Sequence, residues 1–94
     1  SLSEALAKMS LHQARWMEQA SPAFAKKGRL REGMDADIVI FNSATVAANA
    51  TYGDPYQKPT GIEHVIVGGR QVVQDSVRIE GRYPGRKILG RPQP

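Results

Sequence analysis

A hairpin signature in the second half of the chain places the strongest constraint on its fold. The stretch GIEHVIVGGRQVVQD, residues 61–75, has two strand-like runs, 62–67 and 70–74, joined by Gly68-Gly69. Two successive glycines suit the positive φ angles of a two-residue hairpin turn. Counting outward from that turn predicts the pairs Val67 with Arg70, Ile66 with Gln71, Val65 with Val72, and His64 with Val73.

Both faces of this hairpin are apolar in the predicted register. One face carries Val65, Val67 and Val72, and the other carries Ile62, Ile66 and Val73. The run IVIF at residues 38–41 has no polar residue on either face, so it also requires cover on both sides. A chain of 94 residues makes one domain at most and buries only roughly 60–65% of the surface that its unfolded form exposes. We therefore expect strands that need more cover than these residues supply.

The first part of the chain is predicted to be helical. Leu2, Ala5, Leu6 and Met9 recur three and four residues apart. Ser1 with Glu4, and Ser10 with Gln13, have the spacing of capping boxes, which predicts two short helices with a bend at Ser10. Ser21-Pro22 ends the helical region, because the residue before a proline avoids the α conformation, and residues 22–27 are expected to form a connector. A helix that starts at residue 1 suggests a truncated chain.

Less regular segments complete the expected layout. Residues 42–61 are predicted to form a long loop with a helical turn near 47–49. Val77 and Ile79 alternate with charged residues, which indicates a last, half-exposed strand, and the chain after Leu89 is expected to be extended or disordered. The predicted fold class is mainly β with N-terminal helices.

Two aspartates precede the strand at residues 38–41, in the stretch EGMDADIVIFN. Asp35 and Asp37 could be metal ligands, a general acid–base pair, or turn residues. The architectural interpretation is favoured: Gly33 supplies a turn, Asp35 faces solvent, and Asp37 accepts hydrogen bonds from turn amides. A metal-binding or acid–base role remains the alternative.

Other candidates for chemistry have little support. His12 and His64 have no second histidine nearby, so each is expected to be structural rather than a ligand or proton shuttle. No serine lies in a nucleophile elbow, no phosphate loop is present, and cysteine is absent. Asn49-Ala50-Thr51 matches a glycosylation acceptor in a motif short enough to arise by chance. We predict no catalytic, cofactor-binding or metal-ligating residue in this chain.

The net charge of +4 comes largely from the end of the chain. Five of the 13 basic residues lie in the last seventeen positions: Arg78, Arg82, Arg86, Lys87 and Arg91. Nucleic-acid surfaces combine such charge with several stacked aromatic residues, whereas the aromatic residues here are scattered. No stretch has the roughly 18 unbroken apolar residues that a membrane span requires. We expect no nucleic-acid or membrane partner.

The order of these motifs resembles the carboxy-terminal end of metal-dependent amidohydrolases, most closely the N-acyl-D-amino-acid deacylase branch. The stretch KGRLREGMDADIVIFN, followed by GIEHVIVGGRQVV and PGRKI, carries the likeness. Gly28, Leu30, Gly33, Ala36 and Asp37 occupy the places of the family pattern. Four turn or cap positions depart from it, at Gln13-Ala14, Asn42, Gly68-Gly69 and Asp75-Ser76.

The resemblance implies a division into residues 1–27, terminal helices and connector from the barrel side; 28–89, part of a β-sandwich subdomain; and 90–94, a disordered tail. It also implies that the catalytic barrel lies outside this chain. That barrel would bind one or two divalent metal ions, with zinc expected, and activate water to hydrolyse the amide C–N bond of an N-acyl amino acid or a similar small amide.

The expected partners are the missing barrel and amino-terminal strands, with a homodimer as another way to cover the apolar faces. The expected location is the cytoplasm. The competing prediction is a stand-alone, non-catalytic β-module that binds a protein or an acidic partner through its basic tail.

Overall fold

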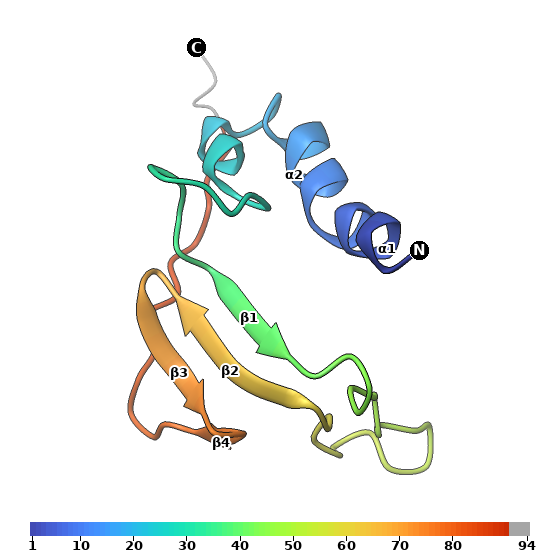
Figure 1. Cartoon of the computed structure of the whole chain (residues 1–94). Coiled ribbons are helices and arrows are strands. Elements are labelled where there is room, and N and C mark those ends of the chain that lie inside the picture. The colour runs from blue at the N-terminus through green and yellow to red at the C-terminus, as the bar shows by residue number, and fades with distance from the viewer. Residues whose placement is uncertain (91–94) are drawn as a thin grey trace. The chain divides into compact units, whose positions relative to one another are not determined.

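The computed structural model describes residues 1–90, which run from helices into an antiparallel sheet (Figure 1). The predicted fold class, mainly β with N-terminal helices, is confirmed at this level. The structure forms two compact units. A helical unit comprises Ser1–Asp37 together with the described residues 85–90, and a sheet unit comprises Ile38–Pro84.

These units divide the chain differently from the predicted ranges 1–27, 28–89 and 90–94. The segment between Gly28 and Asp37 and the segment that begins at Gly85 both belong to the helical unit. The predicted ranges concern the border between domains of a larger protein, and they stay a prediction. Of the predicted disordered tail, residues 91–94 lie outside the described residues.

Two helices open the helical unit, α1 (Leu2–Met9) and α2 (Leu11–Met17), and the predicted bend at Ser10 is confirmed. The Ser1 hydroxyl accepts a hydrogen bond from the Glu4 amide at 3.2 Å, as the first capping box predicts. The prediction of a second capping box is wrong. Ser10 makes no side-chain cap, because its hydroxyl turns back and donates to the carbonyl oxygen of Leu6 at 2.7 Å.

The connector after α2 is a short 3₁₀ helix, η1 (Pro22–Lys26), rather than irregular chain. Ser21 is extended, with φ −143° and ψ 111°, as expected for a residue before proline. Pro22 can nevertheless start a new helical turn, because the first position of a helix needs no amide donor. The predicted connector, residues 22–27, therefore contains a short helix.

The sheet unit has four antiparallel strands in the order β1 (Ile38–Phe41), β2 (Ile62–Val67), β3 (Arg70–Gln74) and β4 (Val77–Arg78). The predicted hairpin turn is present, with φ of +57° at Gly68 and +80° at Gly69. The predicted last strand is also present, although it has only two residues. A backbone hydrogen bond of 2.8 Å from Ile79 to Val72 continues its pairing with β3.

The predicted register of the hairpin is right for two pairs and wrong for the next two. Val67 pairs with Arg70 and Ile66 with Gln71, but Val65 then pairs with Val73 instead of Val72. An irregularity between Val65 and Ile66 leaves one extra residue on β3, as in a β-bulge. Because a shift by one residue exchanges the faces of a strand, Val73 joins the face of Val65 and does not lie opposite His64.

The long loop between β1 and β2 is held together by its own hydrogen bonds. Ala47 and Thr60 form an isolated antiparallel bridge, with hydrogen bonds of 3.1 and 3.0 Å in the two directions. The predicted helical turn near residues 47–49 is therefore wrong. Pairing with Thr60, a contact that is distant in sequence, takes the place of local helical bonding.

Very little of the described chain is buried. Among residues 1–90, only Ala14 and Ser21 are buried, at 3% and 4% relative exposure. The described strands form one sheet, and Val39 and Ile40 of β1 remain 53% and 44% exposed. The sheet thus lacks the cover that its sequence requires, and the second layer of a sandwich stays a prediction. Within residues 1–90, no helix has the length and apolar character needed to cross a membrane.

Candidate functional site

The two aspartates of the stretch EGMDADIVIFN meet on one lysine. Lys27 directly follows η1 as its C-cap residue, and its ammonium group lies 2.5 Å from Asp37 Oδ2 and 3.1 Å from Asp35 Oδ2. A backbone hydrogen bond of 3.1 Å from the Asp35 amide to the Lys26 carbonyl holds the two segments together. The Asp35 side chain is only 30% exposed, so the prediction that it faces solvent is corrected. Its ion pair with Lys27 draws it inward.

This cluster is suited to architecture rather than to catalysis. The hydrogen bond to Asp37, with a smaller contribution from Asp35, raises the pKa of Lys27 despite partial desolvation of the ammonium group. Lys27 therefore stays protonated near neutral pH and cannot act there as a base. Its ammonium group also sits against the carboxylate oxygens where a bound cation would have to lie.

Arg29, which was not among the residues predicted from the sequence, is the most highly connected side chain near this cluster. Its Nη1 donates to the carbonyl oxygens of Phe24, Ala25 and Lys27 at 3.1, 2.5 and 3.1 Å. Its Nη2 lies 3.3 Å from Glu18 Oε2. The guanidinium group thus binds the carbonyls at and just after the end of η1 and ties them to Glu18 at the end of α2. The sequence did offer one signal for this role of Arg29, because basic side chains near the end of a helix often bind its last carbonyl groups.

Gly28 lies between these two basic residues with φ +69°. A Cβ atom on this residue would lie 2.8 Å from the Ser10 carbonyl oxygen and 3.1 Å from Leu11 Cα. The position therefore excludes any side chain, both by backbone conformation and by contact. Gly33, predicted to supply a turn, has φ +85°, which agrees with that prediction.

The C-terminal segment completes the helical unit. The Ser21 hydroxyl donates to the Leu89 carbonyl oxygen at 2.5 Å. Ile88 lines a hollow together with Ala14, Met17 and Phe24, and Lys27 and Asp37 stand at the same hollow. Its two charged groups, Lys27 and Asp37, are engaged with each other.

The two histidines lie in different units. His64 Nδ1 is 2.9 Å from Gln71 Nε2, and His64 Nε2 is 3.8 Å from Asp75 Oδ1. These contacts join β2 to β3 and to the turn before β4, in keeping with the predicted structural role. His12 is exposed on α2. Asn49, the residue of the glycosylation match, donates from Nδ2 to the Lys58 carbonyl oxygen at 2.9 Å.

The described residues do not fit a catalytic metal. No group of three or more His, Cys, Asp or Glu side chains that could hold a metal ion occurs within residues 1–90. The candidate pair of neighbouring carboxylates, Asp35 and Asp37, is engaged by Lys27. No step of a metal-dependent reaction is therefore assigned to the side chains of this chain.

Known proteins resemble this chain over most of its length. A model of the amidohydrolase family matches residues 1–73. Two curated enzymes of Alcaligenes xylosoxydans xylosoxydans are similar: an N-acyl-D-aspartate deacylase, 36% identical over 79 residues, and an N-acyl-D-glutamate deacylase, 41% identical over 90 residues. These alignments cover 84% and 96% of this chain but only 16% and 17% of the deacylases.

A solved structure agrees with the sequence matches. The crystal structure of a D-aminoacylase aligns with a TM-score of 0.62 and 38% identity, covering 68% of this chain and 13% of that enzyme. The chain thus spans about one sixth of the length of the curated relatives described here. The likeness to deacylases that was inferred from KGRLREGMDADIVIFN and the hairpin is confirmed.

Proposed function

Because the chain belongs to the amidohydrolase family, we propose that it is the carboxy-terminal part of a metal-dependent hydrolase that cleaves the amide C–N bond of an N-acyl amino acid or a similar small amide. The observation that carries this proposal is the similarity to two deacylases at 36% and 41% identity. Both act, by name, on N-acyl-D-amino acids, so these compounds are the first substrates to test.

We assign this chain a structural role within that hydrolase. The proposal is supported by the Lys27 cluster, in which the ammonium group of Lys27 forms ion pairs with the carboxylates of Asp35 and Asp37. It is also supported by the lack of a metal-holding group among residues 1–90. The catalytic residues and one or two metal ions, which we propose to be zinc, would lie in a barrel outside this chain.

The sheet unit would form one layer of a β-sandwich in the complete protein. Its exposed apolar residues support this proposal, because Val39 and Ile40 are half exposed on a strand with no polar side chain. Strands and barrel wall from elsewhere in the same polypeptide would cover them, with a homodimer as the other source of cover. We place the complete enzyme in the cytoplasm.

The test is to express the longest reading frame that contains this sequence and to measure release of the free amino acid from N-acetyl-D-aspartate, N-acetyl-D-glutamate and N-acetyl-D-leucine. The N-acetyl-L compounds serve as matched controls. We expect hydrolysis of at least one D compound, loss of activity after chelation, and recovery with zinc. Absence of hydrolysis in a folded, metal-loaded protein would refute the proposed activity.

The same experiment distinguishes the proposed hydrolase from the competing prediction, a stand-alone basic β-module. A reading frame that supplies no barrel, together with a stable 94-residue protein that binds an acidic partner, would support that module. One basic residue of the C-terminal segment is already engaged within the chain, because Arg82 Nη1 donates to the Gln71 carbonyl oxygen at 3.1 Å.

A further inference from the structure

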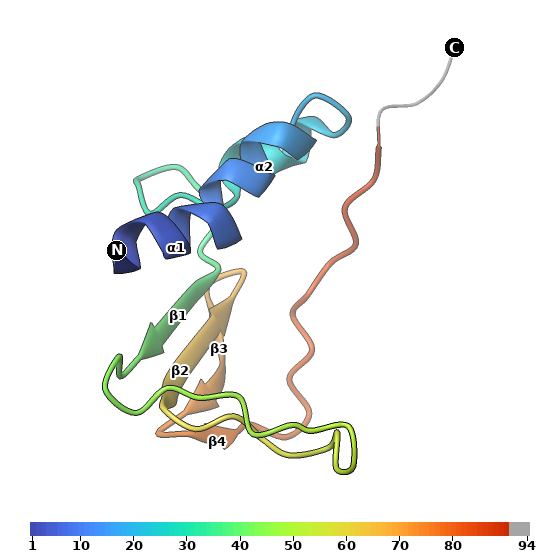
Figure 2. The same ribbon diagram turned by 90° about the vertical axis from the view of Figure 1, so that its right-hand side faces the viewer.

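The loop between β1 and β2 forms an ordered projection, residues 47–60, which we name the tyrosine arm. At its base, Ala47 and Thr60 exchange two backbone hydrogen bonds. Further along, Asn49 Nδ2 donates to the Lys58 carbonyl oxygen at 2.9 Å. Figures 1 and 2 show the arm extending beyond the ends of β1 and β2. The two sides of the arm are therefore tied together at two levels.

The tip of the arm is also held by hydrogen bonds. Thr51 and Asp54 exchange backbone hydrogen bonds of 3.0 and 3.2 Å, and the Thr51 hydroxyl accepts a third from the Asp54 amide at 3.0 Å. Gln57 Nε2 donates to Asp54 Oδ2 at 2.5 Å. Because these contacts lie within the arm, its conformation is set before any partner arrives, and less entropy is lost on binding.

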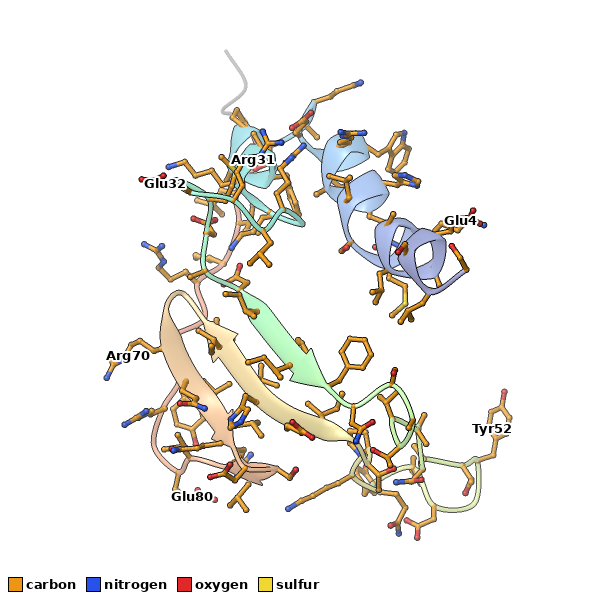
Figure 3. The ribbon with its side chains drawn as sticks, viewed as in Figure 1. Glu4, Arg31, Glu32, Tyr52, Arg70 and Glu80 are labelled. Atoms are coloured by element: carbon orange, nitrogen blue, oxygen red, sulfur yellow. The ribbon has the colours of Figure 1, made fainter. Side chains whose placement is uncertain are left out.

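This preformed tip presents two tyrosines to solvent. Tyr52 has a relative exposure of 110% and Tyr56 of 93%. Figure 3 shows Tyr52 pointing away from the strands. A tyrosine buries about 150–250 Å² when it is covered, and its hydroxyl can still find a polar partner, which makes tyrosine a frequent anchor of protein interfaces.

The charge of the arm points to a protein surface as its partner. Asp54 and Lys58 are the charged residues of the segment, so its formal charge cancels, in a chain whose net charge is +4. A neutral arm has no electrostatic attraction to a polyanion. Exposed tyrosines on a segment that also carries Asn49, Thr51 and Gly53 instead match the composition of surfaces that recognise proteins.

We propose that the tyrosine arm is an interaction surface that inserts Tyr52 and Tyr56 into a recess on the remainder of the same polypeptide. This inference rests on the proposed function, which places the chain within a longer hydrolase. The relatives support this occupant over a second copy, because this chain accounts for only 16% and 17% of their length. A tethered partner is also present at an effective concentration on the order of millimolar, which a second copy seldom reaches.

The test measures the solvent access of each tyrosine in the full-length polypeptide. Tetranitromethane nitrates accessible tyrosines, and peptide mass spectrometry gives a rate for each residue in the native protein and in urea. We expect Tyr52 and Tyr56 to react at least tenfold more slowly in the native protein. Equal rates in the two states would overturn the proposal. Protection that disappears on hundredfold dilution would also overturn it, because the occupant would then be a second copy.

Variants supply a second measurement. Replacing both tyrosines by alanine should lower the Tm of the full-length protein by several degrees, whereas replacing both by phenylalanine, the matched control, should lower it less. An unchanged Tm in the alanine variant would contradict the inference. Deacylase activity is measured separately: protected tyrosines in a protein without activity would support the arm and refute the proposed function, and active protein with freely reacting tyrosines would do the reverse.

Discussion

Replacing Gly28 by alanine tests most directly how the helical unit is held together. Two costs are expected. The first is conformational, because φ is +69° and an L-residue in the left-handed region loses about 1–2 kcal/mol. The second is steric, because the new methyl group would lie 2.8 Å from the Ser10 carbonyl oxygen, 3.0 Å from the Ser10 carbonyl carbon and 3.1 Å from Leu11 Cα.

The steric cost can be isolated with a matched glycine in the same unit. Gly33 has φ +85°, but a Cβ atom added there would meet no atom within 4 Å, so Gly33→Ala should suffer the conformational cost alone, about 1–2 kcal/mol. Overpacking in a closely packed place costs typically about 1–3 kcal/mol. The colliding atoms at Gly28 are backbone atoms at the bend between α1 and α2, which cannot rotate away. We therefore expect Gly28→Ala to lose about 2–5 kcal/mol in total.

Equilibrium urea unfolding followed by far-UV circular dichroism gives the free energy of unfolding of both variants. The quantity that matters is the difference between them, because changes in the unfolded chain are nearly the same for two Gly→Ala replacements. Equal losses of stability would show that the close approach of Gly28 to Ser10 is not present in solution, and would refute the reasoning.

Three further predictions concern individual contacts. Ser76→Gly should raise the free energy of unfolding by about 0.5–1 kcal/mol, because Ser76 has φ +67° and glycine adopts this conformation without strain; a loss in thermal denaturation would contradict this. Arg29→Lys should cost about 1–3 kcal/mol in urea unfolding, because lysine cannot reach three carbonyl oxygens and Glu18 together; unchanged stability would show that these contacts contribute little. The raised pKa of Lys27 stabilises the folded state fully below about pH 10.4, the unfolded value, and this stabilisation is lost as pH rises through the folded pKa. Lys27→Gln should therefore show a smaller loss of stability between about pH 9 and about pH 12 than the wild-type protein does, and parallel curves would exclude the effect.

The elements that were predicted correctly depend on neighbouring residues. Gly68-Gly69 determines a hairpin turn through its own backbone freedom, and the Ser1 cap needs only an amide three residues away. The resemblance to the amidohydrolase family could also be predicted from the sequence, because it rests on the order of such local turn motifs along the chain. The paired strands and the two short helices followed from these signals.

The incorrect predictions concern features that depend on residues far apart in the sequence. The β-bulge beside Ile66 depends on how two strands fit together, and no local pattern distinguishes Val72 from Val73 as the partner of Val65. Residue 47 pairs with Thr60 instead of forming a helical turn, because the cross-strand bond competes with the local one.

The candidate site shows the same limit. The spacing of Asp35 and Asp37 left three roles open, and the deciding residue was Lys27, which belongs to another element. Arg29 was missed because its partners, the carbonyl groups at the end of η1, exist only once that helix has formed.

The return of the chain to the helical unit has a consequence for synthesis on the ribosome. The sheet unit, Ile38–Pro84, is inserted between two parts of the helical unit. The hydrogen bond from Ser21 to Leu89 joins residues 68 positions apart. The helices therefore emerge first but cannot close their unit until the residues after Gly85 have also emerged. A ribosome that stalls within the sheet leaves the helical unit unfinished, and the hollow beside Met17 and Phe24 still lacks Ile88.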